Sequence, residues 1–226
     1  MARYKPLFAQ KNLPLKHVWQ EDLGFRAAKN RNNAIQEATG EYIITIDTDI
    51  ILSPMFIYDH LYFARPKVLL QGGRILLTPK ESAKILRQQD FSLAYAKKSF
   101  KNRRILSLAK FIYKHRRVTQ KIFQKHTMVV GVRSCNMSFS REDCLAIEGF
   151  NENFVGWGRE DSEFVARFLF NHGVLKPLKF CALVYHLHHQ ENTRDLLPEN
   201  HTLYLQTLKA QRIRWKDPSK SLYCPN

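Results

Sequence analysis

Cysteine is scarce in this sequence, and the few cysteines present follow no metal-binding or disulfide pattern. Four occur among 226 residues, and no two of them stand in Cys-x-x-Cys spacing. This argues against a zinc ribbon and against a disulfide scaffold, so we expect a reducing compartment. The four are Cys135, Cys144, Cys181 and Cys224.

Long apolar runs are also missing. No stretch reaches the 18 or so apolar residues that a membrane span needs, and the first residues lack the apolar core of a signal peptide. We therefore expect a cytoplasmic protein. With 44% hydrophobic and 12% aromatic residues, the chain is apolar enough for one globular domain with a sizeable core.

Acidic residues are few relative to basic ones. The sequence has 20 Asp and Glu against 36 Lys and Arg, which gives a formal net charge of +16. A charge of this size predicts an anionic partner, which is phosphate, nucleic acid or an acidic membrane surface. Zinc-finger spacing and ribonucleoprotein motifs are absent from the sequence, so we expect no nucleic acid as partner and keep nucleic-acid binding as an alternative that charge alone supports.

The charge imbalance is greatest in residues 91–127, which contain no acid and many Lys and Arg. Apolar residues recur among them at roughly helical spacing. The segment is therefore predicted to be a basic amphipathic helical insertion. It either lies on an anionic membrane or packs its apolar face on the domain.

The most informative stretch, residues 40–50 (GEYIITIDTDI), is a β-branched run that ends on two carboxylates. Because alternate residues of a strand point the same way, we expect Asp47 and Asp49 to face one ion or its bound water. Hard oxygen ligands suit Mg²⁺ or Mn²⁺. The carboxyl ends of strands are also where open α/β sheets bind ligands. The alternative is a simple turn, which Asp favours.

The residues before this stretch predict a strand and a helix. Residues 13–20 are interpreted as an edge strand, and residues 27–38 as a helix that Gly40 ends. Strand, helix and strand at this spacing predict a parallel βαβ unit. Arg26 and Arg31, in the first turns of the helix, lie where a phosphate would bind, or else belong to a solvated polar face.

A second helix and strand are predicted after the two carboxylates. Residues 55–64 form an aromatic-rich helix, and the strand at residues 68–71 ends at Gly72, Gly73 and Arg74. Paired glycines either let the backbone approach a ligand or make a turn, and we favour the turn.

A second group of candidate residues follows residue 128. Residues 129–132 and 135–140 predict strands, and residues 141–147 a short helix. The tripeptide at 156–158 is a glycine-flanked loop whose Trp157 either stacks on a sugar or fills the core. Glu160 and Asp161 then open a helix. The helix dipole favours acids there, and alternatively one of them is a general base toward a hydroxyl.

Three histidines come after an apolar strand that starts at Phe180. Imidazole is a good ligand for Mn²⁺ or Zn²⁺. On a continued strand, His186 and His188 share one face while His189 points away. The remainder predicts a helix at about residues 201–214 and a polar tail.

Two sets of motifs resemble a known family. The segments GFRAAKNRNNAI (24–35) and GEYIITIDTD (40–49) are similar to the middle of a family 2 glycosyltransferase of GT-A fold. The segments NMSF (136–139), GFNE (149–152) and GWGRED (156–161) resemble the C-terminal galactosyltransferase module of β-1,4-galactosyltransferases and bacterial chondroitin-type polymerases. The similarity covers about residues 13–194.

This resemblance implies an α/β fold of the GT-A, Rossmann-like kind, with a mixed, mostly parallel sheet flanked by helices. It implies an inverting transfer from a nucleotide-sugar to a glycan or lipid-linked glycan acceptor. The expected carrier is uridine diphosphate, and the expected cofactor is Mn²⁺ or Mg²⁺. The resemblance also implies residue roles. The catalytic residues are Asp161 and Glu160. The metal ligands are Asp47, Asp49 and His186, with His188 and His189 as substitutes. The donor-binding residues are Arg26, Arg31, Asp47, Gly73 and Arg74, and the acceptor- or sugar-binding residues are Trp157, Gly158 and Glu160.

One departure from the family concerns the N-terminus. Members begin with a strand, a helix and a second strand that hold the nucleoside, whereas about a dozen residues precede the matching part here. We therefore expect an N-terminally truncated GT-A fold. The single domain, residues 1–226, is expected to divide into a metal and donor half (13–90), the basic insertion (91–127), an acceptor and catalytic half (128–195), and a C-terminal helix and tail (196–226).

Three functions follow from these observations. The first is a glycosyltransferase on the inner face of the cell membrane that builds surface polysaccharide or lipooligosaccharide, held at the membrane by the basic insertion. The second is a truncated, non-catalytic remnant of such an enzyme. The third, supported by charge alone, is a nucleic-acid-binding protein, which predicts steeply salt-dependent binding to oligonucleotides.

Overall fold

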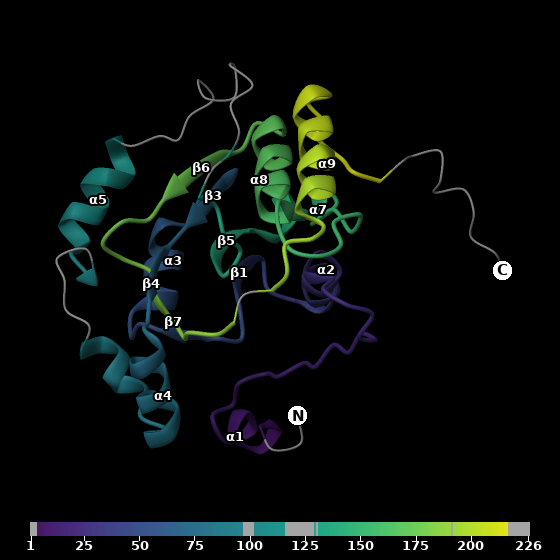
Figure 1. The fold of residues 1–226 in the computed structure, drawn as a ribbon. Helices are drawn as coiled ribbons and strands as arrows, with labels where there is room; N and C mark the ends of the chain where they lie inside the picture. Colours follow the sequence, from purple (N-terminus) through teal and green to yellow (C-terminus); the bar gives the residue numbers. More distant parts are fainter. Residues whose placement is uncertain (1–3, 97–101, 116–128, 130, 191, 217–226) are drawn as a thin grey trace.

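The computed structural model describes residues 4–96, 102–115, 129, 131–190 and 192–216. Within these ranges the chain forms two small mixed sheets with helices around them (Figure 1). The helices are α1 (Lys5–Gln10), α2 (Ala27–Glu37), α3 (Phe56–Phe63), α4 (Pro79–Gln88), the 3₁₀ helix η1 (Phe91–Ala96), α5 (Leu106–His115), α7 (Arg141–Ala146), α8 (Glu160–Phe170) and α9 (Leu197–Lys209). None of these described helices is both long and apolar enough to cross a bilayer.

The first sheet has four strands in the order β1-β5-β3-β6. They are β1 (Tyr42–Ile46), β5 (Asn136–Ser140), β3 (Val68–Gln71) and β6 (Val174–Pro177). Strand β5 runs antiparallel to both β1 and β3, and β3 pairs with β6 in parallel. Four of the five residues of β5 are buried, because this strand is central in the sheet and covered on both faces.

The second sheet has three strands in the order β2-β7-β4. They are β2 (Ile50–Leu52), β7 (Leu183–His186) and β4 (Gly73–Leu76). Strand β7 is antiparallel to β2 and parallel to β4. The two sheets are joined directly twice, by residues 47–49 between β1 and β2 and by Gly72 between β3 and β4. Both junctions lie near the start of β5, since Ile46 at the end of β1 pairs with Asn136 and Gly72 N donates to Asn136 O at 3.0 Å.

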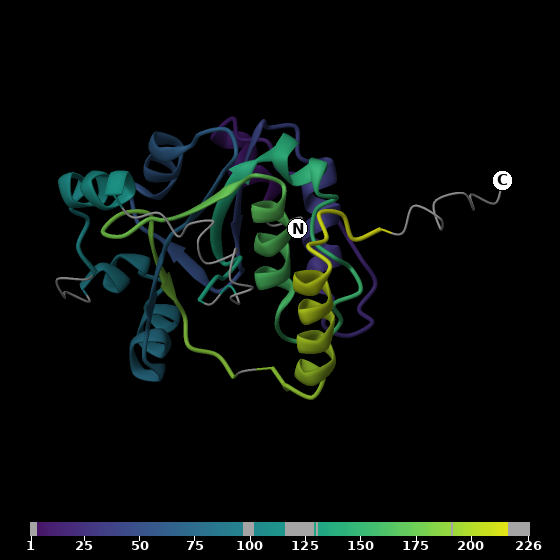
Figure 2. The same cartoon turned by 90° about the horizontal axis from the view of Figure 1, so that it is seen from above.

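Helix α8 is the best-buried helix of the second half and packs against α9 (Figures 1 and 2). Its Phe164 ring stacks on Phe150 at 4.1 Å between ring centroids. A fully buried ion pair joins Arg167 Nε to Glu163 Oε2 at 2.8 Å, and Arg167 also donates to Gly149 O at 2.7 Å. These contacts fix the start of α8 relative to the loop before it.

Most of the predicted helices are confirmed, with boundaries that differ by a few residues. The helices predicted at 27–38, 55–64 and 141–147 are α2, α3 and α7. The helix predicted at 201–214 is α9, which starts and ends earlier. The predicted basic helix is present as α5, and residues 97–101 and 116–128 of that segment lie outside the described residues.

The fold class is confirmed as mixed α/β, but the pairing differs from the expectation of a mostly parallel sheet. Among the described strands, three pairings are antiparallel and two are parallel. The expected βαβ unit is not formed, because residues 13–20, all of them described, run as an extended segment without strand pairing. This segment is tied to α2 instead, where Lys16 Nζ donates to Glu37 O at 2.7 Å.

Two smaller expectations also need correction. Residues 129, 131 and 132, the described part of a predicted strand, are irregular. The paired glycines do not make a turn, because Gly73 begins β4 and Gly72 joins it to β3. A Cβ at Gly72 would lie 2.2 Å from Asn136 Oδ1, so only glycine fits beside this side chain.

Candidate active site

Asp47 and Asp49 lie on the three-residue link between the two sheets. Strand β1 ends at Ile46 and β2 begins at Ile50, so neither aspartate is part of a strand. The alternation that predicted a common direction therefore does not apply to them. Asp47 approaches Arg31 of α2, whereas Asp49 approaches His186, the last residue of β7, and His189, three residues later. The two carboxylates thus belong to two adjacent clusters.

The first cluster, which we call the carboxylate cluster, consists of Arg31, Asp47, Glu160 and Asp161. Arg31 Nη2 lies 3.4 Å from Asp47 Oδ1, and its Nη1 lies 3.4 Å from Glu160 Oε1 and 3.5 Å from Asp161 Oδ1. Burial of Arg31 lowers its pKa, but the three negative charges outweigh this and raise the pKa overall. One guanidinium therefore holds together carboxylates that would otherwise repel one another.

Two of the three acids of this cluster, Glu160 and Asp161, open α8, where the helix dipole favours negative charge. Asp161 uses both carboxylate oxygens, because its Oδ2 accepts from Ser134 N at 2.9 Å while Oδ1 faces Arg31. Glu160 is buried beside it. Burial and the charge of Asp161 raise the pKa of Glu160 to about 7, although Arg31 opposes this shift. The neighbouring acids thus differ in their environments.

Asp47 is more open to solvent than the other two acids, with a side chain 40% exposed. Partial burial raises its pKa, and the charges of Asp161 and Asp49 act in the same direction while Arg31 opposes them. The pKa of Asp47 is therefore influenced by an acid from each cluster.

The second cluster, which we call the histidine cluster, consists of Asp49, His186 and His189. His186 Nε2 lies 3.4 Å and His189 Nε2 lies 3.0 Å from Asp49 Oδ2. One ligand atom from each of the three residues lies within 4.8 Å of the others. Burial lowers the pKa of His186, which favours the neutral imidazole that binds metals.

The donor set of the histidine cluster fits a divalent metal ion. Asp49 Oδ1 is buried and, among the described residues, has no hydrogen-bond partner, an arrangement that leaves a carboxylate oxygen available to an ion. One carboxylate and two imidazoles suit Mn²⁺ or Zn²⁺ better than Mg²⁺, which prefers oxygen ligands alone.

The partner of His186 is His189 rather than His188, contrary to the expected alternation. Strand β7 ends at His186, so the three residues after it do not continue the strand period. The backbone N of His188 donates to Ser82 Oγ at 2.8 Å, which anchors this residue near α4. The chain after His188 turns back toward β7, so the ring centroid of His189 lies 5.1 Å from that of His186.

The remaining predicted donor residues lie in different places. Arg74 of β4 is close enough to His186 for its charge to lower the pKa of that histidine. Gly73 precedes it and lies beside Leu183, which a Cβ would approach to 3.1 Å. Arg26 donates to Glu21 O in the segment before α2, and no contact described here joins it to the carboxylate cluster.

The Gly-Trp-Gly loop leads directly into the carboxylate cluster. Gly156 and Gly158 both have positive φ. A Cβ at Gly156 would lie 2.8 Å from Leu196, the N-cap of α9, and one at Gly158 would lie 2.8 Å from Leu197, its first residue. The loop is therefore packed against α9 without room for side chains at these positions. Arg194 lies over the half-buried Trp157 ring, with its Cζ 4.8 Å from the ring centroid.

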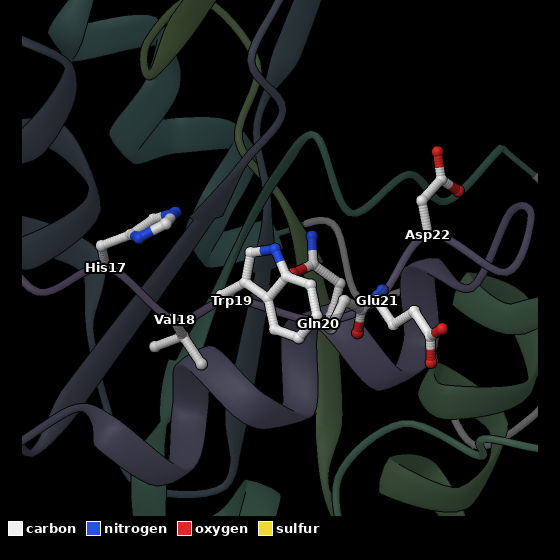
Figure 3. A pocket seen from close by; sticks show the side chains of 7 residues that line it. His17, Val18, Trp19, Gln20, Glu21 and Asp22 are labelled. Atoms are coloured by element: carbon white, nitrogen blue, oxygen red, sulfur yellow. The ribbon is translucent and has the colours of Figure 1, made fainter.

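A shallow cavity of about 300 Å³ lies apart from both clusters. Residues 17–22 line it together with Asn30 of α2, and its indole, Trp19, is 74% exposed (Figure 3). No residue of the carboxylate or histidine cluster lines it. We therefore locate the candidate chemistry in the two clusters.

Sequence reasoning missed Ser134 and Cys135. Ser134 contributes a backbone N–H, which carries no signature of residue type. Cys135 lies near Asp47 and Asp161, and burial together with these charges raises the pKa of its thiol to about 11, so the thiol stays neutral. Their position directly before β5 could have indicated them as site residues, because the other site residues lie at strand ends on this edge of the sheet.

Known protein families match most of the chain. The family model described as glycosyl transferase family 2 matches residues 8–137, which is more than half of the chain. A second model, described as the N-terminal domain of galactosyltransferase, matches residues 114–190. The first match contains Arg31, Asp47 and Asp49, and the second contains Asp161 and His186.

Curated relatives match over a shorter part of their own length. A validoxylamine A glucosyltransferase of Streptomyces hygroscopicus subsp. jinggangensis (strain 5008) is 27% identical over 174 residues, which cover 72% of this chain and 39% of that protein. The protein of the same name from subsp. limoneus is also 27% identical, and the match covers 36% of it. The chain thus spans well under half the length of these relatives.

A solved structure confirms the fold. The crystal structure of GalNAc-T7 with UDP, GalNAc and Mn²⁺ superposes with a TM-score of 0.57 at 12% identity, covering 91% of this chain and 38% of that one. The extent of the first family match and the shared GT-A fold lead to one conclusion: the chain belongs to glycosyl transferase family 2.

Proposed function

We propose that this protein is an inverting, metal-dependent glycosyltransferase that moves a sugar from a nucleotide-sugar to a glycan hydroxyl. The main support is the arrangement of the two clusters. Arg31 holds the acids at the start of α8 beside Asp47. Asp49, two residues further along the chain, faces two histidines. A proton acceptor and a set of metal ligands thus meet at one edge of the fold.

Asp161 is the proposed general base. Its Oδ2 is fixed by Ser134 N–H and its Oδ1 by Arg31, so the carboxylate is oriented before an acceptor arrives. Asp161 takes the proton of the acceptor hydroxyl, and the hydroxyl oxygen forms a bond to the anomeric carbon of the donor sugar. The bond from that carbon to the diphosphate oxygen breaks, so the nucleoside diphosphate leaves from the opposite face and the configuration inverts.

Glu160 and Trp157 are proposed to bind the sugars. With a pKa raised to about 7, Glu160 is partly protonated near neutral pH and can both donate to and accept from sugar hydroxyls. The Trp157 ring, next to Gly158, offers an apolar face of the kind that sugars stack on.

Asp49, His186 and His189 are the proposed holders of the metal. An ion bound there would offset the negative charge that develops on the departing diphosphate. Two imidazole ligands favour Mn²⁺ or Zn²⁺ over Mg²⁺. We propose Mn²⁺, because GalNAc-T7, a protein of similar fold, was crystallised with Mn²⁺ and UDP. Arg74 and Asp47 lie beside this cluster, and we assign them, with Arg31, to the donor side.

The proposed acceptor is a glycan, or a lipid-linked glycan of a surface polysaccharide or lipooligosaccharide, and the proposed place of action is the inner face of the cell membrane. The basic character of residues 91–127 supports this location. Uridine diphosphate is the proposed carrier, because the structure of similar fold holds UDP.

Calorimetric titration with uridine diphosphate, with and without Mn²⁺, tests the donor site. We expect metal-dependent binding by the unaltered protein and its loss in Asp49→Ala. The Glu142→Ala variant, which removes an exposed acid of α7 outside both clusters, is the control and should bind normally. Failure of a folded protein to bind in any condition would favour a non-catalytic remnant.

A second variant separates binding from chemistry. In Asp161→Asn the shape of the side chain is kept and the base is lost. We expect metal-dependent nucleotide binding to persist while sugar transfer falls by about 100-fold or more, the usual contribution of a general base. Unchanged turnover would refute the assignment of Asp161.

A further inference from the structure

Helix α3 differs from an ordinary surface helix, because it buries two polar side chains beside Phe56 and Phe63 and exposes apolar ones. Its acid and its histidine, Asp59 and His60, are fully buried. Its outer face instead carries Ile57, which is 57% exposed, and Leu61, which is 52% exposed. Soluble helices place apolar residues inward and charges outward, so an outward apolar face marks an interaction site.

The neighbouring helix α5 extends this surface with cations and another apolar side chain. Phe111 is 63% exposed, and Lys110 and Lys114 are exposed on either side of it. Lys110 Nζ lies 4.8 Å from the centroid of the Tyr62 ring on α3, so the two helices share one surface. Figure 2 shows them together on the side of the molecule away from α9.

We call this surface the α3–α5 face. It comprises Ile57, Tyr58, Leu61, Tyr62, Arg65, Arg103, Lys110, Phe111 and Lys114, all of them exposed. Residues 54–66 and 102–115 contain a single acid, Asp59, and this acid is buried in an ion pair with Arg104 at 2.6 Å. The charge that these ranges present to solvent is therefore entirely positive.

We propose that the α3–α5 face docks on an anionic lipid bilayer. Aliphatic and aromatic side chains that reach the acyl boundary, tyrosines at the headgroup level and lysines toward anionic headgroups are the combination that binds such a surface. A nucleic acid would use the cations but not Ile57 and Leu61. The inference deepens the proposed function by assigning the surface through which the protein would reach a lipid-linked acceptor.

Sedimentation with vesicles tests the cationic part of the face. The unaltered protein should bind phosphatidylcholine vesicles containing phosphatidylglycerol at least about tenfold more tightly than phosphatidylcholine alone. Lys110→Glu with Lys114→Glu should lose about tenfold or more of that binding. The matched control, Lys80→Glu with Lys84→Glu, makes the same charge change on exposed residues of α4 and should bind normally. Equal losses in both double variants, or no binding by the unaltered protein, would overturn the proposal.

The apolar part of the face is tested by Ile57→Ser with Leu61→Ser, which should also release the protein from anionic vesicles. These positions are exposed, so the melting temperature should stay unchanged. If this variant still sediments normally and a single-stranded oligonucleotide displaces the vesicles, the face binds nucleic acid and the proposal is wrong. If it changes only self-association, the face joins two copies and the proposal is likewise wrong.

The variant Asp161→Asn separates this inference from the proposed catalysis. It should sediment with anionic vesicles as the unaltered protein does, because Asp161 lies in the carboxylate cluster and not on the α3–α5 face. A failure of membrane binding and a failure of sugar transfer would therefore be observed independently.

Discussion

Arg31 shows how one side chain can organise several others. It lies within 3.5 Å of carboxylate oxygens from the β1–β2 link and from the start of α8. The sequence predicted a phosphate-binding or solvated role for it, and did not predict that it would join the two halves of the site. Such a role depends on contacts between residues about 130 positions apart, which no local pattern encodes.

The two adjacent histidines give a residue-scale prediction with its control beside it. His189→Ala removes a ring that lies 3.0 Å from Asp49 and should weaken Mn²⁺ binding at least about tenfold. His188→Ala should leave it unchanged, because His188 is held through its backbone N. Calorimetric titration with Mn²⁺ alone measures both. Equal effects would mean that the metal is bound elsewhere.

Glu160 provides a prediction about pH. The pKa of Glu160 is about 7 in the folded protein and is raised from 4.5, so the folded state holds this proton more tightly than the unfolded chain. The contribution of Glu160 to the free energy of unfolding is therefore present at low pH and lost as the pH rises toward 7. The melting temperature of Glu160→Gln should fall less than that of the unaltered protein between pH 5 and pH 7. Parallel curves would contradict the raised pKa.

At the scale of elements, the junction of β3 and β4 depends on the absence of a side chain at Gly72. A Cβ there would meet the Asn136 amide, which donates to Gly73 O at 2.9 Å and to Ala182 O at 2.8 Å and so cannot move away. Gly72→Ala should lower the free energy of unfolding by about 1–3 kcal/mol, the usual cost of overpacking.

The control for this substitution is Gly40→Ala. A Cβ at Gly40 would have one neighbour, at 3.7 Å, and its φ lies outside the left-handed region. Its effect on the free energy of unfolding should stay within about 0.5 kcal/mol. Urea denaturation of both variants measures the difference, and a Gly72→Ala variant as stable as Gly40→Ala would show that the junction relaxes.

The element-scale predictions from sequence succeeded where an apolar run had clear end signals and failed where contacts distant in sequence decide the structure. Helices α2 and α3 could be recognised from spacing and end signals, and β1 from its β-branched run. Residues 13–20 have the alternation of a strand but bond to α2, and β6 gave no clear signal before it paired with β3. Pairing of such short strands is decided by tertiary contacts rather than by local propensity.

At the scale of the whole molecule, the buried polar residues behind the site connect α3 to β5. His60 Nε2 lies 2.9 Å from Asn136 Oδ1, and Nδ1 lies 2.7 Å from Ser138 Oγ. Asn136 donates through Nδ2 to two carbonyls, so its Oδ1 accepts, and His60 is the neutral tautomer with the proton on Nε2. The buried polar contact between α3 and β5 therefore contains an uncharged histidine.

Acid should destabilise the protein through this residue. Burial lowers the pKa of His60 to about 4 from 6.5, so below pH 6.5 the unfolded chain takes up the proton more readily than the folded protein. The contribution of His60 to the free energy of unfolding is lost as the pH falls from 6.5 toward 4. Over this pH range, the melting temperature of His60→Gln should decline less steeply than that of the unaltered protein measured at the same pH values. An equally steep decline would assign acid sensitivity to other groups.

The direct link between the two sheets has a consequence for how this chain can change. Residues 47–49 lie between two strands whose pairing register is fixed. Tyr42–Ile46 pairs with β5 before the link, and Ile50–Leu52 pairs with β7 after it. A substitution at Thr48 changes one side chain and leaves the length of the link unchanged. Inserting or deleting one residue would instead move either Asp47 away from Arg31 or Asp49 away from His186. Length at this point is therefore under stronger constraint than the identity of its middle residue, so homologous sequences should vary at Thr48 without gaps on either side of it.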